Sequence, residues 1–297
     1  MTKTRIENFY NNNYKKLLIV PLILLIFAIS TLTIQQTTTG SFVNRDVTLQ
    51  GGISATIYST QEIDKESLEL ALIGSFPNSD ISLRELASFT DKERTGIIIE
   101  ATELTNEELK PFLEETLNIE LTRDIYSIQE IGSALGESFY REMLMAIAFA
   151  FLLMASVVFI IFRKLIPSLA VVLSAILDLG VTLAIVSLLG LKLSSAGIAA
   201  FLMVIGYSID TDILLTTRVL KRKLGTSFER TYGAFKTGIT MTLTTLTALT
   251  TAFLITNSPV LKQMFGIIII ALMVDIIATW CMNAPILTWY TNKNGNK

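Results

Sequence analysis

The chain has 297 residues, of which 51% are hydrophobic and only 17% charged, and its formal net charge is −2. Its mean hydropathy of +0.55 lies well outside the usual balance of a soluble globular protein. We therefore interpret the chain as an integral membrane protein. It has no histidine and a single cysteine, Cys281, which excludes an intramolecular disulfide and argues against a zinc or haem site.

Six segments are apolar and long enough to cross a hydrocarbon core of roughly 30 Å, which takes about 20 helical residues. They cover residues 17–34, 142–162, 165–189, 196–217, 239–256 and 264–289. The first follows Lys15 and Lys16, as a signal peptide would. Its apolar core is too long and meets no Ala-x-Ala-like cleavage site, so we interpret residues 1–34 as a cytoplasmic N-terminus and an uncleaved membrane anchor.

Basic residues in the short loops predict the orientation, because lysine and arginine are enriched on the cytoplasmic side of a membrane. The side that holds both termini carries Lys3, Arg5, Lys15, Lys16, Arg163, Lys164, Arg218, Lys221, Arg222, Lys223, Arg230, Lys236, Lys293 and Lys297. The opposite short loops carry only Lys192 and Lys262. We therefore predict that both termini are cytoplasmic in the cell membrane, that residues 291–297 form a cytoplasmic tail, and that residues 35–141 lie outside.

The segment 35–141 changes abruptly to short strand-like and helix-like patterns. Alternating β-branched residues indicate strands at 53–59, 82–88, 95–101 and 123–132. Helical patterns cover 64–76 and 105–117, and Thr105 with Glu108 forms a capping box at the start of the second. The order β-α-β-β-α-β is that of the split ferredoxin-like fold.

The predicted fold is therefore a membrane all-α bundle of six transmembrane helices, with one α+β ferredoxin-like extracytoplasmic domain between helices one and two. The other five helices occupy residues 142–290. The sequence holds no catalytic constellation and no Gly-rich loop ending in Lys-Ser/Thr, so nucleotide hydrolysis is not expected to supply work here. We expect no enzymatic activity, no cofactor, no metal site and no nucleic-acid partner.

Four carboxylates fall inside the predicted spans: Asp178, Asp210, Asp212 and Asp275. Each ionised acid near the bilayer centre costs on the order of 3 kcal/mol, so these side chains must face protein, water or one another. Intramembrane acids often mark ion pathways. We interpret the four as candidates for a proton relay, against the alternative of static structural hydrogen bonds.

Helical geometry separates the two acids of the fourth span. At 100° per residue, Asp210 and Asp212 lie about 200° apart and cannot serve one site on one face. Asp210 shares a stripe with Gly206, where the missing side chain would let a neighbouring helix approach. Asp212 lies with Ser208 and Thr216. The two acids are therefore predicted to address different neighbours.

Two basic residues are candidate counter-charges in the relay. Arg218 lies two turns beyond Asp210, and Lys236 begins the fifth span. Arg218 has an alternative role as an interfacial anchor that fixes the topology. The threonine-rich stretch 237–251 is interpreted as a helix-packing surface rather than a hydroxyl-lined proton path. Before it, Gly225 predicts a helix end, and Thr226 with Glu229 predicts a capped new start.

The stretch "GYSIDTDILLTTRVLKR" (206–222) resembles the membrane signature of the SecF protein-export family, particularly its archaeal form. SecF belongs with SecD to the resistance-nodulation-division superfamily. The segments "QGGISATI" (50–57), "IGSALG" (131–136) and "ILDLGVTLAIVSLLG" (176–190) resemble other family elements, so the likeness covers nearly the whole chain. It implies a helix-packing motif formed by Gly206, Tyr207, Ser208 and Thr211.

The chain departs from the bacterial pattern in the fourth span. That pattern reads Gly-Tyr-Ser-x-Asn-Asp, so Asp210 occupies the asparagine position and Thr211 the aspartate position. A bacterial arginine implicated in proton movement aligns with Lys236. Asp212 and Asp275 have no bacterial counterpart that aligns, and the resemblance does not identify the acid that carries the proton.

The resemblance implies a non-catalytic subunit that works with SecD beside the Sec translocon channel. The pair is expected to use the proton or sodium motive force to drive external-domain movements that pull or release the exported protein chain. Six spans surrounded by membrane lipid look like half of a machine, so we expect a SecD-like partner. Two alternatives stay open: a half-transporter that exports a small amphiphile by proton antiport, and a static translocon scaffold.

Overall fold

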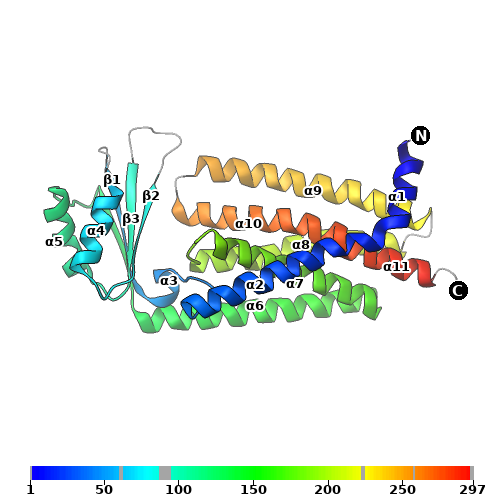
Figure 1. The fold of residues 1–297 in the computed structure, drawn as a ribbon, viewed down its shortest axis with the longest axis horizontal. Coiled ribbons are helices and arrows are strands. Elements are labelled where there is room, and N and C mark those ends of the chain that lie inside the picture. Colours follow the sequence, from blue (N-terminus) through cyan, green and yellow to red (C-terminus); the bar gives the residue numbers. More distant parts are fainter. Residues whose placement is uncertain (1, 60–62, 87–94, 222–224, 257, 295–297) are drawn as a thin grey trace.

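The chain folds into a long helical bundle with a sheet at one end (Figure 1). The structure is a computed structural model and describes residues 2–59, 63–86, 95–221, 225–256 and 258–294. Both termini lie at the end of the bundle farthest from the sheet. We call the sheet with its helices α4 and α5 the sheet lobe, and we call α2 with α6 to α11 the bundle.

Six helices are long and apolar enough to cross a membrane, which confirms the six predicted spans by length and composition. The bundle helices are α2 (Ile19–Thr39), α6 (Ser133–Phe162), α7 (Leu165–Leu188), α8 (Ser195–Lys221), α9 (Ser227–Ile255), α10 (Pro259–Ala278) and α11 (Ala284–Asn294), with α1 (Thr2–Leu17) preceding them. A π-helical turn, η1 (Thr279–Asn283), joins α10 to α11 within the sixth span.

Burial distinguishes inner from outer helices. About half of the most apolar window is buried in α7, α8 and the sixth span, against 11% in α2, α6 and α9. The first three therefore form the centre of the bundle. The capping box of Thr226 and Glu229 is present and starts α9 at Ser227, twelve residues before the predicted span. Residues 222–224, which precede the helix end predicted at Gly225, lie outside the described residues, and so do residues 295–297 of the predicted tail.

The sheet lobe contains four antiparallel strands in the spatial order β2-β3-β1-β4. In chain order its elements are β1 (Gly52–Ser59), α4 (Lys65–Ser75), β2 (Ile81–Leu86), β3 (Thr95–Ala101), α5 (Asn106–Leu117) and β4 (Tyr126–Ile131). The fourth strand begins three residues later than predicted, because Ile125 and Tyr126 donate their amide hydrogens to the Thr122 carbonyl in a turn. Positions 87–88 of the second predicted strand lie outside the described residues.

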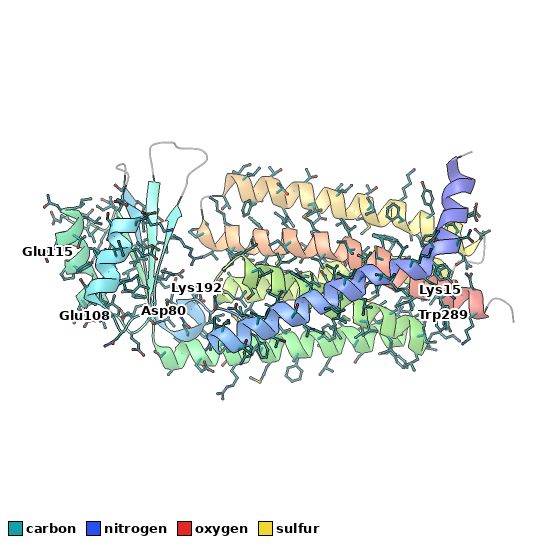
Figure 2. All side chains as sticks on the ribbon, viewed as in Figure 1. Lys15, Asp80, Glu108, Glu115, Lys192 and Trp289 are labelled. Carbon is teal, nitrogen blue, oxygen red and sulfur yellow. The ribbon has the colours of Figure 1, made fainter. Side chains whose placement is uncertain are left out.

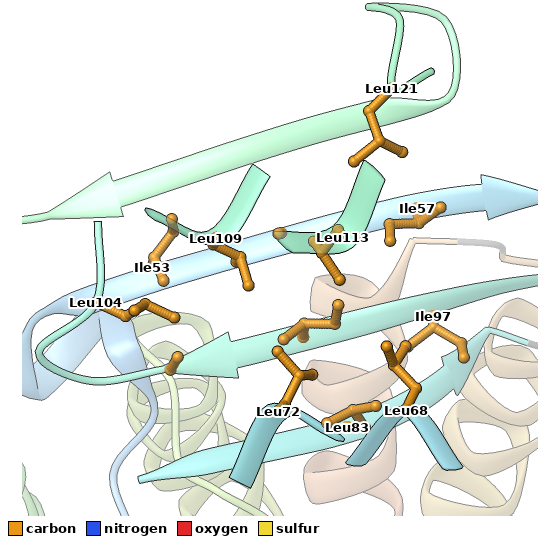
Figure 3. Close-up of a cluster of buried hydrophobic side chains, with 13 residues drawn as sticks. Ile53, Ile57, Leu68, Leu72, Leu83, Ile97, Leu104, Leu109, Leu113 and Leu121 are labelled. Carbon is orange, nitrogen blue, oxygen red and sulfur yellow. The ribbon is translucent and has the colours of Figure 1, made fainter. Parts of the chain in front are cut away.

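Alternation along β1 directs Ile53, Ala55 and Ile57 toward α4 and α5, where all three are buried. They pack there with leucines of both helices, including Leu72 and Leu113 (Figure 3). The predicted capping box of Thr105 and Glu108 is present at the start of α5. The lobe therefore has its own hydrophobic core, separate from that of the bundle.

Two leucines of α4 test this core. Leu72 is fully buried and Leu70 is 73% exposed. We expect Leu72→Ala to destabilise the lobe by about 2–5 kcal/mol, because it removes methylenes from a packed site and leaves a cavity. Leu70→Ala should change stability by no more than about 0.5 kcal/mol. Amide hydrogen exchange of β1 and β3 in the intact chain measures both, and equal exchange in the two variants would contradict the packing described here.

The lobe joins the bundle through α3 (Val47–Gln50) and the loop before α8. Leu193 donates its amide hydrogen to the Asn44 carbonyl (2.6 Å), and Asp46 donates to the Leu193 carbonyl (3.0 Å). The amide of Ser195, the first residue of α8, donates to the Thr48 hydroxyl (2.9 Å). The segment 44–48, which leads into the sheet lobe and which we call the lobe base, is therefore hydrogen-bonded to the start of α8, the helix that carries the predicted relay residues Asp210, Asp212 and Arg218.

Ion pairs add to this junction. The Lys192 ammonium lies 3.6 Å from the Asp80 carboxylate of the lobe, at the meeting point of lobe and bundle (Figure 2). Arg45 pairs with Glu137 of α6 at 2.9 Å. Such exposed pairs contribute roughly 0–1 kcal/mol each. They orient the lobe more than they stabilise it.

Asp46 makes the stability of this junction depend on pH. The pKa of its carboxyl is raised to about 6, mainly by burial and also by the charge of Glu100, while hydrogen bonds from Thr48 and the charge of Arg84 oppose the shift. Folding therefore favours the protonated form. The associated stability is fully present below the unfolded pKa, about 4, and is lost as pH rises through about 6.

We expect thermal stability in detergent to fall between pH 4 and pH 6, by about 3 kcal/mol at most from Asp46. The matched variant is Asp46→Asn, because asparagine still accepts the Thr48 amide as a helix cap but does not titrate. Its stability curve should be flatter over this range. An unchanged slope in the variant would assign the pH dependence to other groups.

Candidate ion-coupling site

Three central helices each present a buried polar stripe to the others. The residues are spaced by four, so each stripe occupies one helix face. The stripe of α7 is Ser174, Asp178 and Thr182; that of α8 is Ser208, Asp212 and Thr216; that of α10 and η1 is Asp275, Thr279 and Asn283. None of the nine side chains is more than 1% exposed. We call these nine residues the acid cluster.

Hydrogen bonds connect α8 to α10 and η1 within the acid cluster. Ser208 Oγ donates to Asp275 Oδ1 at 2.6 Å, and Asn283 Nδ2 donates to Asp212 Oδ1 at 2.7 Å. Thr279 Oγ1 lies 3.0 Å from Asp212 Oδ1 and 3.3 Å from Asp275 Oδ1. Two carboxylates on different helices are thereby joined through one hydroxyl.

Asp178 completes the acid cluster from α7. Its carboxylate interacts electrostatically with Asp275 and Asp212. Neither of its oxygens has a partner with good hydrogen-bond geometry, and the same is true of Ser174 Oγ and Thr182 Oγ1, although the Ser208 hydroxyl lies near Asp178 and the Ser174 hydroxyl lies near Asp212. Buried polar oxygens without partners are rare and costly, so this side of the cluster has unused capacity for protons or water.

The acid cluster holds no basic side chain. Across the part of the chain that the structure describes, no lysine or arginine forms an ion pair with Asp178, Asp212 or Asp275. Like charges that share a buried site cannot all ionise without a large energetic cost. At least one of the three carboxyl groups must therefore be protonated or bound to another cation. Within the same described residues, no three acidic, histidine or cysteine side chains converge to hold a metal ion.

The structure does not bring the other predicted relay residues into the acid cluster. Asp210 is exposed on the outer side of α8, as the helical geometry predicts. Arg218 is half-buried and donates from Nη1 to the Gly233 carbonyl of α9 at 2.5 Å. Lys236 is exposed on α9. Neither basic residue serves as a counter-charge to the buried acids.

The four residues of the predicted packing motif divide into two exposed and two buried residues. A Cβ built on Gly206 would meet no atom within 4 Å, and Tyr207 is exposed, so no helix described in this structure packs closely at Gly206. Ser208 and Thr211 are buried. The close approach occurs instead at Gly238 of α9, where a Cβ would come within 2.8 Å of the Trp280 ring.

Sequence reasoning missed Thr279 and Asn283, although their four-residue spacing from Asp275 was visible in the sequence. It also missed Ser174 and Thr182, which have the same spacing from Asp178. For the threonines of 237–251, the sequence favours helix packing over a hydroxyl-lined proton path. Their hydroxyls largely bond back to the carbonyls of their own helix, for example Thr247 Oγ1 to Leu243 O at 2.8 Å.

Fold and site together define a multi-pass membrane protein whose bundle encloses a cluster of acids. Residues 113–293 match the family described as "Protein export membrane protein SecD/SecF, C-terminal". The protein-export membrane protein SecF of Methanocaldococcus jannaschii is 37% identical over 285 residues, which cover 94% of this chain and 96% of that protein. SecF of Pyrococcus furiosus is 32% identical, covering 99% and 97%. The chain belongs to the SecF family of protein-export membrane proteins.

A solved structure has the same fold. The crystal structure of SecDF, a translocon-associated membrane protein from Thermus thermophilus, matches with a TM-score of 0.75 and 21% identity. The match covers 95% of this chain and 38% of the SecDF chain. SecDF in its super-membrane-facing form matches with a TM-score of 0.60. The lower score means that this chain superposes less well on that form.

Proposed function

We propose that this chain is a SecF-type accessory subunit of the Sec protein-export machinery. It acts with a SecD-like subunit to couple the proton or sodium motive force to late steps of translocation. The observation that carries the proposal is the acid cluster, which has three buried carboxylates on three helices and, among the described residues, no lysine or arginine paired with them. A cluster of this kind gains and loses cations, and one charge crossing 100 mV is worth about 2.3 kcal/mol. We assign it no catalytic chemistry.

We further propose that the sheet lobe is the ferredoxin-like extracytoplasmic domain, spanning residues 35–141 between helices one and two. Its β-α-β-β-α-β order and its sheet order support this assignment. Both termini would then be cytoplasmic in the cell membrane. Their position at the far end of the bundle and the excess of basic residues there support this orientation (Figure 1). In this orientation the lobe would contact the exported chain and the translocon channel.

An exposed stripe on α8 supports the proposal that this chain binds a partner within the membrane. Met203, Gly206, Tyr207 and Asp210 share this face and are all exposed. A carboxylate that faces lipid near the middle of a span is costly, so Asp210 needs a polar or cationic neighbour, and no ion pair to it occurs among the residues that the structure describes. We propose that a SecD-like subunit covers the stripe and supplies that neighbour. The outer surfaces of α2, α6 and α9 would then face lipid.

The test is export in proteoliposomes that contain the chain, its SecD-like partner and the translocon. A pH or sodium gradient is imposed, and the protease-protected fraction of a secretory protein is measured. We expect one gradient to increase that fraction and an ionophore to cancel the increase. Export that ignores both gradients would overturn the coupling and favour the static scaffold, in which the acids only hold the helices together.

The small-amphiphile transporter is not favoured. It requires a ligand-sized apolar pocket, and sites of that kind measure about 300–1,000 Å³. The sheet lobe has an open pocket of about 260 Å³ between the start of α4 and the end of α5. Asp64, Ser67 and Thr116 contribute polar groups to its lining. Apolar side chains such as Leu68 and Leu117 line the rest of it. Its volume lies below that range, and the relatives are named for protein export.

A further inference from the structure

Thr279 has an unusual position between two acids of the acid cluster. It is fully buried, and its hydroxyl oxygen lies 3.0 Å from Asp212 Oδ1 and 3.3 Å from Asp275 Oδ1. A hydroxyl has one hydrogen and can also accept. It can therefore donate to one carboxylate at a time while accepting a hydrogen bond from the other if that one is protonated.

The surrounding donors fix the two carboxylates on either side of Thr279. Asn283 holds Asp212 at 2.7 Å and Ser208 holds Asp275 at 2.6 Å. Thr279 is the first residue of the π-helical turn η1, and Asn283 is the last. Single π-helical turns within a helix are frequently found at functional sites. The turn carries both of the groups that bond Asp212 from the sixth span.

We propose that the Thr279 hydroxyl transfers a proton between Asp275 and Asp212. In the transfer, the O–H bond of protonated Asp275 breaks and its proton binds Thr279 Oγ1. The original Thr279 O–H bond breaks at the same time, and that proton binds Asp212 Oδ1. Asp275 ends as a carboxylate, Asp212 as a carboxylic acid, and Thr279 is unchanged. The step moves one proton from α10 to α8 and needs no other reactant.

The charged groups around this bridge fit such a transfer. Asp178 of α7 is the other titratable group that faces both acids, and α8 contributes Ser208 but no basic residue. No described lysine or arginine would trap the proton on one side. The amide of Ser195, the first residue of α8, donates to the Thr48 hydroxyl beside the lobe. A shift of α8 that follows a change of charge at Asp212 would therefore be transmitted to the lobe. The inference rests on the proposed function, in that a proton is the coupling ion.

Three substitutions separate proton transfer from simple hydrogen bonding. Thr279→Ser keeps the hydroxyl. Thr279→Asn, of similar volume, keeps a donor and an acceptor but its amide does not pass on a proton. Thr279→Val keeps the shape and removes both functions. The matched control is Thr242→Val on α9, because Thr242 is also buried but its hydroxyl bonds only to the Gly238 carbonyl.

The readout is gradient-driven proton flux in proteoliposomes that contain the full complex, with thermal stability measured in parallel. We expect Thr279→Ser and Thr242→Val to stay within about twofold of the wild type, and the Asn and Val variants at 279 to lose about a hundredfold of the flux. Normal flux in Thr279→Asn would overturn the bridge and leave the proposed function intact. Absent proton flux in the wild type would overturn the bridge, and the proposed function falls with it only if a sodium gradient also drives neither flux nor export.

Discussion

Asp212→Asn is expected to remove gradient-driven export while leaving the assembled complex intact. Asp212 is fully buried and accepts from Thr279 and Asn283 through the same oxygen, Oδ1. Asparagine has nearly the same shape and retains a carbonyl oxygen for these donors, but it cannot bind and release a proton. The basal, gradient-independent rate should stay near the wild type. Protease-protected secretory protein, measured with and without an imposed pH gradient, gives both rates.

The matched control lies two residues earlier on the same helix. Asp210→Asn makes the same chemical change on the exposed face of α8. It should leave the response to the gradient unchanged in complexes that form, and instead lower the yield of the copurified SecD-like partner, because it removes the charge that the partner is proposed to neutralise within the membrane. A loss of gradient response in Asp210→Asn with normal Asp212→Asn export would contradict the assignment of the acid cluster as the coupling site.

The sequence was sufficient to assign much of this site, because helical spacing is a local property. The four-residue spacing of Ser208, Asp212 and Thr216 predicts one face, and the structure buries all three. The opposite placement of Asp210 follows from the same geometry. Which faces of different helices meet is a long-range property. Nothing in the sequence shows that the stripes of α7, α8 and α10 converge, and Arg218 was assigned by its distance along one helix.

The sequence could not show which helix packs at a given glycine, for the same reason. A glycine in a span permits a neighbouring helix to approach closely, but only where another helix lies beside it at the same depth in the membrane. Gly206 has no such neighbour in this chain, whereas Gly238 meets Trp280 and Thr211. In the sheet lobe the outcome was better, because capping boxes and strand alternation report local structure. The hydrogen bonds between the lobe base and α8 join residues about 150 positions apart, and no local pattern predicts them.

Gly51→Ala is expected to disrupt the connection between lobe and bundle. Gly51 has a φ of +85°, and a Cβ there would lie 2.3 Å from the Cα of Ser133 in α6. Backbone atoms cannot rotate away as a side-chain end can, so α3 or the start of α6 must move. We expect a loss of roughly 3–5 kcal/mol in the free energy of unfolding, well above that of a typical point substitution.

Gly40→Ala separates the two causes of this loss. Gly40 also has a positive φ, +72°, but a Cβ there would meet nothing within 4 Å. It should therefore lose only the conformational term, about 1–2 kcal/mol. Thermal unfolding in detergent and proteolysis between β4 and α6 measure both variants. Equal losses at the two positions would mean that α6 yields easily at Ser133. The lobe would then pivot freely on the bundle, and a change of charge at Asp212 would reach it only through the loop before α8.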